Sequence, residues 1–348
     1  MRVLNVMFGC GRGGLEQAAV DYHEALQIKE HHVTSVLHPA ASVKDAITAS
    51  GGDIATIKPR GEWDFLAARK LRKLAESTQA DVLICHGNRA IGLALKAVKN
   101  IVPVIGVAHN YNIEKRFPKC DGIFCITRDL VEDMVHLDIG RDKLRHIPNM
   151  IRSQPVAKRT QFRTPVIIGA MGRFVEKKGF DSYLQMLKAL QELGVTFQAK
   201  LGGGGPMEEK LRQKAKEFGL DEVLTFCGWV EEKDAFFRDI DVFVLPSYHE
   251  PFGIVLIEAM AAALPCVTTD TEGPCEIIRQ YHDAIMVEKA RPYQMAAEIR
   301  DLVERPQAAF EMGYHAHLKA RDCYDIHVVS ERIDMALTQL VTAKTQPI

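Results

Sequence analysis

Short apolar runs alternate with helix-period segments along this chain, and this pattern constrains the fold more than any other feature. In the first half the runs are residues 3–8, 33–37, 82–85, 104–108 and 122–126. After a break the pattern restarts at residues 166–171 and continues to 266–268. Such alternation is typical of parallel strands with helices on both faces. The sequence therefore predicts an α/β protein with two Rossmann-like, doubly wound domains.

The boundary between the two domains is predicted from an irregular, polar segment that contains prolines. We place the linker at residues 151–165, between domains at 1–150 and 166–325. Residues 326–348 are expected to be a final helix. Doubly wound sheets bind ligands at the carboxyl ends of their strands, so functional residues are expected in the loops that follow the strands.

Composition excludes several classes of protein. A chain of 348 residues with 47% hydrophobic content is large enough for two cores. The formal net charge of −1 gives no basic excess for a nucleic-acid partner. The eight cysteines form no Cys-x-x-Cys pair and are interpreted as free, buried thiols, which favours a cytoplasmic protein. No His, Asp or Glu cluster has metal-ligand spacing, and no cofactor is expected.

Two glutamates flank the start of a strongly apolar helix. Glu250 precedes Phe252 and Gly253, and Glu258 lies within the apolar run that follows. A buried glutamate needs a partner, which a ligand with hydroxyl groups can supply. The backbone N–H groups at the start of this helix favour an anion. The alternative is an internal salt bridge between Glu258 and an Arg or Lys.

A basic loop follows the strand at 166–171. Arg173 and Lys178 are five residues apart and suit a diphosphate, because Arg gives forked hydrogen bonds and Lys a point charge. A solvated basic loop is the alternative. The glycines at 202–205 are interpreted as a structural turn, with a phosphate-facing role as the alternative. His109 follows the strand at 104–108 and is either a site residue or a structural histidine.

Two further motifs have competing interpretations. Residues 9–14 match G-x-G-x-x-G, but the second strand ends without the acidic residue that a dinucleotide site requires, so we interpret them as a phosphate-approach loop. The segment from Arg60 to Lys73 combines Trp63, Phe65 and Leu66 with the basic residues Arg69, Lys70, Arg72 and Lys73. This segment is either an amphipathic helix on an anionic membrane surface or a helix with a solvated face.

Together these segments resemble the family 4 retaining glycosyltransferases of the GT-B fold, in which two Rossmann-like domains face a central cleft. The resemblance is strongest over residues 171–269, where Gly-Arg-Phe-x-x-x-Lys-Gly, Val-Leu-Pro-Ser and Glu-Pro-Phe-Gly-(x)4-Glu-Ala-Met-Ala occur in the family's order. The motif at the linker, just before residue 151, reads Pro148-Asn149-Met150, where members often have Pro-Asn-Gly. The first loop has Gly-Gly-Leu-Glu, where many members have Gly-Gly-Ala-Glu.

The resemblance implies an N-terminal acceptor-binding domain, a C-terminal domain that binds the nucleotide-sugar donor, and a final helix that crosses back to the N-terminal domain. The implied catalytic residues are His109, Arg173, Lys178 and Glu250. The implied donor-binding residues are Gly13, Gly14, Gly228, Trp229, Val230, Phe252, Gly253, Ile254 and Glu258.

The expected reaction is metal-independent, retaining transfer of a hexose from a nucleotide diphosphate sugar, with a UDP-sugar as first choice. The acceptor is a hydroxyl of a glycan or lipid-linked molecule in lipopolysaccharide or cell-surface polysaccharide synthesis. The alternatives are a nucleotide-sugar 2-epimerase and a catalytically silent nucleotide-sugar-binding protein. The expected location is the cytoplasm, with peripheral contact at the inner face of the cell membrane through Arg60 to Lys73.

Overall fold

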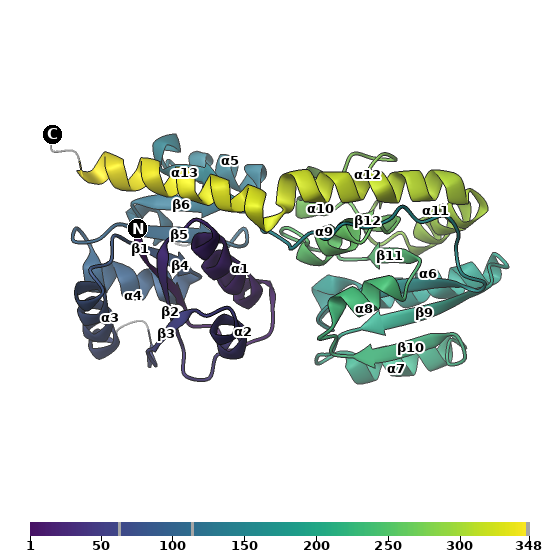
Figure 1. Cartoon of the computed structure of the whole chain (residues 1–348). Helices are drawn as coiled ribbons and strands as arrows, with labels where there is room; N and C mark the ends of the chain where they lie inside the picture. The colour runs from purple at the N-terminus through teal and green to yellow at the C-terminus, as the bar shows by residue number, and fades with distance from the viewer. Residues whose placement is uncertain (62–63, 113–114, 346–348) are drawn as a thin grey trace. The chain divides into compact units, whose positions relative to one another are not determined.

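The computed structural model describes residues 1–61, 64–112 and 115–345 (Figure 1). The chain forms two compact units. One combines Met1–Ile151 with Asp325–Ile348, and the other is Arg152–Tyr324. Each unit has its own parallel sheet with helices between the strands. The prediction of two doubly wound α/β domains is therefore confirmed.

The N-terminal unit contains a seven-stranded sheet of order β3-β2-β1-β4-β5-β6-β7, and every neighbouring pair is parallel. Its strands are β1 (Arg2–Met7), β2 (His32–Leu37), β3 (Asp53–Thr56), β4 (Val82–His86), β5 (Val104–Ala108), β6 (Gly122–Cys125) and β7 (Leu144–His146). Its helices are α1 (Gly14–Ile28), α2 (Lys44–Ala49), α3 (Phe65–Ser77), α4 (Asn88–Val98), α5 (Arg128–His136) and α13 (Ile326–Thr345). The central strands are wholly buried, because helices cover both faces.

The last helix, α13, packs beside α1 in the N-terminal unit (Figure 1). Val329, Ile333 and Leu337 of α13 join Tyr22 and Leu26 of α1 in one apolar core. At the edge of this core an ion pair 2.6 Å long joins Lys29 to Glu331. Fully burying a Val, Leu or Ile side chain contributes about 1.5–3 kcal/mol, so the apolar stripe of α13 accounts for most of its attachment.

The C-terminal unit contains a six-stranded parallel sheet of order β10-β9-β8-β11-β12-β13. Its strands are β8 (Val166–Met171), β9 (Phe197–Gly202), β10 (Leu224–Gly228), β11 (Val242–Leu245), β12 (Cys266–Thr269) and β13 (Ile285–Val287). Its helices are α6 (Phe180–Glu192), α7 (Glu208–Glu217), α8 (Lys233–Arg238), α9 (Ile254–Ala261), α10 (Glu272–Ile277), α11 (Pro292–Glu304) and α12 (Pro306–Tyr324). A large core lies between this sheet and helices that include α6 and α11, and further buried side chains, such as Phe243 and Met260, lie outside it.

Each sheet has a point where the strand order reverses. In the N-terminal unit it lies between β1 and β4, and in the C-terminal unit it lies between β8 and β11. At such a point the two neighbouring loops lead away in opposite directions, which leaves a hollow at the carboxyl ends of the strands. The loops at residues 172–179 and 246–253 therefore meet at the reversal point of the C-terminal sheet.

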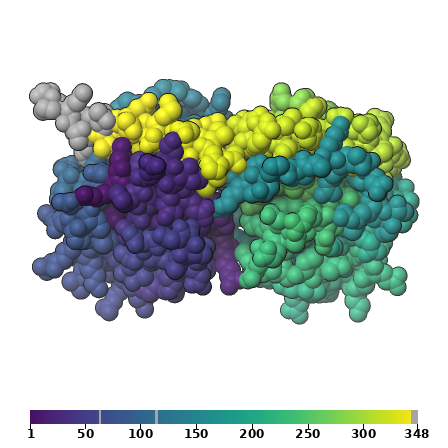
Figure 2. Space-filling model, in the orientation of Figure 1, coloured from purple at the N-terminus to yellow at the C-terminus, as the bar shows by residue number. Residues whose placement is uncertain are grey.

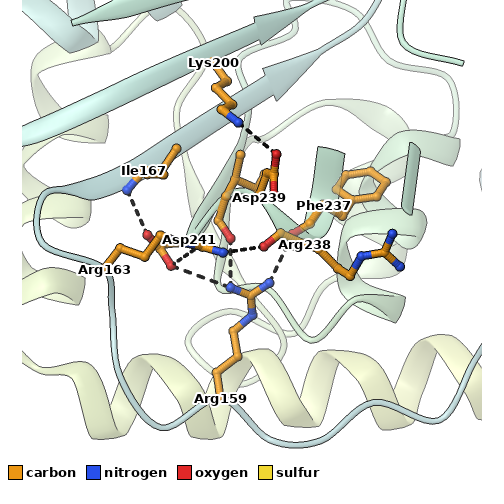
Figure 3. A network of polar contacts seen from close by, with 9 residues as sticks. Arg159, Arg163, Ile167, Lys200, Phe237, Arg238, Asp239 and Asp241 are labelled. Atoms are coloured by element: carbon orange, nitrogen blue, oxygen red, sulfur yellow. Dashed lines mark hydrogen bonds and ion pairs between the residues drawn. The ribbon is translucent and has the colours of Figure 1, made fainter. Parts of the chain in front are cut away.

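The segment at residues 152–165 belongs to the C-terminal unit, and Figure 2 shows it as a teal band across that unit's surface. Arginines fix it to the end of α8 (Figure 3). Arg159 donates to the carbonyl oxygens of Phe237 and Ile240, at 3.1 and 2.8 Å. Arg163 donates to Asp241 Oδ1 at 2.9 Å. Cations are stabilised at the C-terminal end of a helix, where the last carbonyls lack intrahelical partners.

The same carboxylate ties this segment to the sheet. Asp241 Oδ2 accepts from the backbone N–H of Ile167 at 2.9 Å, and Asp241 N–H donates to the Ile167 carbonyl at 2.7 Å (Figure 3). The contacts on both sides of Asp241 fix the start of β8. They therefore also fix the direction in which the chain leaves β8 toward Arg173.

Two further features of the structure are the exposure of the cysteines and the length and apolar character of the helices. All eight cysteines are free, but the expectation that they are buried is wrong for Cys10, Cys227 and Cys275, which are exposed, and Cys323 is only half-buried. Cys10 lies in the glycine-rich loop after β1, and Cys275 lies in the short helix α10. Within the described parts of the chain, no helix combines the length and apolar character needed to cross a bilayer.

Candidate functional site

Two loops at the reversal point of the C-terminal sheet are held together by backbone contacts. The Lys177 carbonyl accepts hydrogen bonds from the N–H groups of Tyr248 and His249, at 2.9 and 3.2 Å. Gly179 has φ +65, and a Cβ there would lie 2.0 Å from the carbonyl oxygen of Pro246. Only glycine tolerates both conditions. The loop that carries Lys178 is therefore held against the loop that carries Glu250.

Lys178 and Glu250 form an ion pair between Nζ and Oε2. Ser247 Oγ also donates to Glu250 Oε2, at 3.3 Å. The backbone of Glu250 is fixed as well, because its N–H donates to Glu272 Oε2 and its carbonyl accepts from Gly273. Glu250 is 7% exposed, so its carboxylate needs these partners.

The loop that carries Arg173 rests on the glycine turn at 202–205. Phe174 N–H donates to the Gly204 carbonyl at 2.8 Å. A Cβ on Gly203 would lie 1.8 Å from the Gly172 carbonyl oxygen, so this close approach requires glycine. These contacts favour the structural interpretation of the glycine turn. The side chain of Arg173 is exposed.

Three cations act on one another at this position. Burial is the main cause that lowers the pKa of Lys177, and repulsion from Lys178 and Arg173 adds to it. Glu250 opposes the shift. Because Lys177 is affected by all three charged side chains, they form one cluster. A dianionic ligand would relieve the repulsion among the cations.

Glu258 lies in α9 with its two oxygens in different surroundings. Oε1 pairs with Lys233 Nζ at 2.6 Å. Oε2 is buried and has no hydrogen-bond partner among the described residues. Burial is the main cause that raises the pKa of Glu258, and Lys233 opposes it. The internal salt bridge that was the alternative to a ligand is thus present, but it satisfies only half of the carboxylate.

The start of α9 provides unused backbone donors. No described residue accepts a hydrogen bond from the N–H groups of Phe252, Gly253 or Ile254. The Phe252 side chain is buried and packs edge-on against Tyr324, with ring centroids 5.9 Å apart. This contact holds the loop, so the N–H groups at the positive end of the helix are fixed in place.

Gly228, Trp229 and Val230 lie at the end of β10. The Gly228 carbonyl accepts from Gly203 N–H at 2.6 Å, so this turn contacts the glycine turn beneath Arg173. Trp229 is 44% exposed. Its indole is an apolar surface at the carboxyl end of the C-terminal sheet, where a planar ring can stack.

In the N-terminal unit, Gly13 is the N-cap residue of α1 and Gly14 is the first residue of that helix. His109 follows β5 and is partly buried. Its Nε2 lies 2.9 Å from Nδ1 of His86, the last residue of β4. Burial lowers the pKa of His109 to about 4. The predicted site residues therefore divide between the two units, with ten in the C-terminal unit and His109, Gly13 and Gly14 in the N-terminal unit.

The segment predicted as an amphipathic helix is α3, which begins at Phe65 after the N-cap Asp64. Phe65 and Leu66 are 69% and 72% exposed. Trp63, which the sequence placed in the same segment, lies outside the described residues.

Several residues that contact or influence the predicted site residues were not singled out from the sequence. Lys177, Lys233 and Glu272 contact or influence the predicted residues, and His86 contacts His109. Lys177 is adjacent to Lys178, so the pair of consecutive lysines could have indicated that Lys177 also belongs to the site. Lys233 is 25 residues from Glu258 and on another helix, so no local pattern connects them.

Comparisons with known proteins agree with this fold and these motifs. The family model described as glycosyl transferases group 1 matches residues 154–319, and that described as glycosyltransferase family 4 matches residues 12–154. The lipopolysaccharide core biosynthesis glycosyltransferase LpsD of Rhizobium meliloti is 28% identical over 88% of this chain and 89% of its own length. LpsE of the same organism is 28% identical over 87% and 89%.

Solved structures give the same fold. The chain matches Anabaena Alr3699/HepE in complex with UDP with a TM-score of 0.83, at 15% identity over 97% of this chain and 100% of that one. It matches a glycosyltransferase from Rickettsia africae with a TM-score of 0.84, at 14% identity over 98% of both chains. The chain belongs to the family 4 glycosyltransferases of the GT-B fold. It is a glycosyltransferase, as the sequence motifs predicted.

Proposed function

We propose that this glycosyltransferase transfers a hexose from a UDP-sugar to a hydroxyl of a glycan or lipid-linked acceptor, with retention of the anomeric configuration. The cluster at the reversal point of the C-terminal sheet carries the proposal. There Arg173, Lys177 and Lys178 lie around the buried Glu250, and a diphosphate is the ligand that such a group of cations favours. The UDP complexes of Alr3699/HepE, which has the same fold, support uracil as the base.

The diphosphate is bound by Arg173 and Lys178 in this proposal. Their charges stabilise the leaving group as its negative charge grows in the transition state. The N–H groups of Phe252, Gly253 and Ile254 lie at the positive end of α9, where an anion gains about 0.3–1 kcal/mol. The two side chains therefore dominate. Because they provide the positive charge that a divalent cation would bring, we propose that the reaction is metal-independent.

The carboxylates orient the rest of the donor. Glu258 Oε2 is an acceptor that lacks a protein donor, and the ribose hydroxyls of UDP fit that need. The uracil stacks at the turn formed by Gly228, Trp229 and Val230. Glu250 accepts a hydrogen bond from a hydroxyl of the transferred sugar, while Lys178 moves to the diphosphate.

The N-terminal unit is assigned to the acceptor. His109 accepts a hydrogen bond from a substrate hydroxyl, and the backbone of Gly13 and Gly14 approaches the donor phosphates. The names of LpsD and LpsE support an acceptor in lipopolysaccharide synthesis. Phe65 and Leu66 are exposed at the start of α3, and basic residues follow them. These side chains support contact with the anionic inner face of the cell membrane.

Incubation of the purified chain with UDP-sugars and a deacylated lipopolysaccharide core tests the proposal. We expect UDP release coupled to transfer, an unchanged anomeric configuration by proton NMR, and full activity in EDTA. UDP at ~100 times its dissociation constant should stabilise the chain by about 2.7 kcal/mol. GDP and NADH are the controls. Binding without turnover, 2-epimerisation of the donor without acceptor, or an inverted product would contradict the proposal.

A further inference from the structure

A chain of hydrogen bonds runs from His109, which follows β5, to β4 and β1 at the reversal point of the N-terminal sheet. His109 Nε2 lies 2.9 Å from His86 Nδ1, and His86 Nε2 lies 2.8 Å from Asn5 Oδ1. Asn5 lies in β1, and its Nδ2 donates to the Ala19 carbonyl at 2.8 Å. Asn5 and His86 are buried, at 0% and 2% exposure. No other pair of described histidine rings shares a hydrogen bond in this unit.

The direction of each hydrogen bond follows from the last acceptor. The Ala19 carbonyl can only accept, so the nitrogen of the Asn5 amide faces it and Oδ1 faces His86. Oδ1 can also only accept, so His86 Nε2 carries a proton. Burial lowers the pKa of His86 well below its usual range, so the ring is neutral and its Nδ1 has a lone pair. That lone pair accepts from His109, so His109 Nε2 must carry a proton.

The protonation state of the second nitrogen of His109, Nδ1, follows from this as well. Burial keeps the His109 ring neutral near pH 7, and a neutral imidazole with a proton on Nε2 has a lone pair on Nδ1. No described residue donates a hydrogen bond to this Nδ1. An atom of this kind accepts from a hydroxyl and has no attraction for a phosphate or carbonyl oxygen.

We propose that Asn5 and His86 are positioning residues, which fix His109 in the Nε2–H tautomer so that Nδ1 accepts a hydrogen bond from a substrate hydroxyl. The inference depends on the proposed function only for the role of His109. Ring packing supports it, because Tyr22 lies edge-on to His86 with centroids 5.0 Å apart, and His86 stacks on His109 at 5.1 Å. The orientation of the His109 ring is thereby fixed before substrate binds, which lowers the cost of ordering it in the complex.

The decisive experiment is NMR of the full chain with 15N-labelled histidine, assigned with His109→Gln and His86→Asn. We expect a 15N–15N coupling across the hydrogen bond between the two rings, with the proton on His109 Nε2. A proton on His86 Nδ1, or a protonated Nδ1 in His109, would overturn the proposal. This measurement needs no substrate, so it decides the tautomer even if no UDP-sugar is turned over.

A matched pair of variants tests the consequence for activity. His86→Asn keeps an acceptor near the position of Nδ1, whereas His86→Leu has none, and both leave Asn5 Oδ1 without its donor. We expect His86→Leu to lower kcat about tenfold or more, because it loses part of the ~10²–10⁴-fold that a positioned acid or base contributes, while His86→Asn stays within about threefold of the native chain. Equal kcat in the two variants, at equal Tm, would show a merely structural role and refute positioning.

The same variants distinguish whether the hydroxyl belongs to the donor sugar or to the acceptor. If it belongs to the donor sugar, His86→Leu lowers the slow hydrolysis of the UDP-sugar without acceptor as well as transfer. If it belongs to the acceptor, transfer falls and hydrolysis does not. Either result supports the proposal. An unchanged rate of both reactions would contradict it.

Discussion

The Lys178 ammonium is paired with the Glu250 carboxylate in the free protein, so the cation proposed for the donor diphosphate already has a buried partner. Binding of the donor must therefore exchange one anion for another at Lys178 and give Glu250 a hydroxyl donor in return. Such an exchange makes the two residues dependent on each other, both in stability and in donor binding.

Lys178→Met is expected to lower the free energy of unfolding by about 3 kcal/mol, because removal of one member of a buried ion pair leaves the other charge uncompensated. The double variant Lys178→Met with Glu250→Gln should recover most of this loss. Urea unfolding measures both. UDP-sugar affinity, measured by calorimetry, should stay low in the double variant, since the diphosphate still lacks its cation.

Lys210→Met is the matched control for Lys178, because Lys210 is exposed on α7 in the same unit. It should change neither stability nor donor affinity by a measurable amount. Additive effects of the two substitutions at Lys178 and Glu250 would disprove the dependence between them.

Glu258→Gln should stabilise the protein and weaken donor binding. The buried Oε2 has no partner, and burial raises the pKa of this carboxyl, so its charged form is unfavourable in the free protein. Gln removes that charge, and the partly exposed Lys233 remains hydrated. We expect a gain of about 0.5–2 kcal/mol, as at other strained functional positions, together with a lower affinity for UDP.

Lys233→Met removes the other member of the same ion pair and is expected to have the opposite effect on stability. It leaves the Glu258 charge buried without its cation and should lower Tm. A lower Tm for Glu258→Gln, with unchanged UDP affinity, would show that Glu258 has a purely structural role.

Gly179→Ala is expected to lower both stability and diphosphate affinity. A methyl group there would meet the Pro246 carbonyl and separate the loop of Lys178 from the loop of Glu250. Gly194→Ala is the control, because Gly194 also has positive φ, +74, but no atom lies within 4 Å of the added Cβ. The control should lose about 1–2 kcal/mol from backbone strain alone. Equal losses, measured by urea unfolding, would contradict the role of the close approach.

Stability should fall as the pH decreases from about 6.5 to 4. Burial lowers the pKa of His86 and His109, to about 4 for His109, whereas an unfolded histidine has its pKa near 6.5. The unfolded chain therefore binds more protons in this window, which makes the free energy of unfolding rise with pH. This contribution is complete above pH 6.5 and is lost as the pH falls toward 4. Asp283 acts in the same direction, but only below its usual pKa of 3.8.

The comparison that isolates His109 is the His109→Gln variant, with unfolding measured between pH 7.5 and 4.5. Its stability should depend less on pH than that of the native chain. The same slope in both proteins would mean that His109 is not a buried neutral histidine.

The long central strands and the loops that carry the candidate site residues could be predicted from sequence, because both depend on local patterns. The run that forms β4 is wholly apolar before His86, and Glu258 interrupts an apolar helix. The edge strands β3, β7 and β13 were missed, since they have only four, three and three residues and are too short to show a pattern. Edge strands are buried on fewer sides, so their sequences are less constrained.

The partners of the site residues could not be predicted, because they come from other elements. Lys233 reaches Glu258 from α8, and Asn5 reaches His86 from β1. These contacts depend on the order of strands in each sheet, which the sequence pattern does not contain. They also decide which nitrogen of His109 has a proton and which oxygen of Glu258 lacks a partner.

Replacement of Phe65 and Leu66 by serine should weaken binding to anionic vesicles. Both side chains are exposed at the start of α3, and Arg69, Lys70, Arg72 and Lys73 follow them. Insertion of the apolar side chains and attraction of the cations each contribute, at about 1 kcal/mol per basic residue near the surface. We expect at least about a tenfold lower partition coefficient in sedimentation with vesicles of phosphatidylglycerol and phosphatidylethanolamine, which corresponds to 1.4 kcal/mol. Tyr293→Ser is the control, since Tyr293 is equally exposed in the C-terminal unit. Native chain that stays in solution with these vesicles, or equal binding of all three proteins, would show that α3 is an ordinary helix with a solvated face.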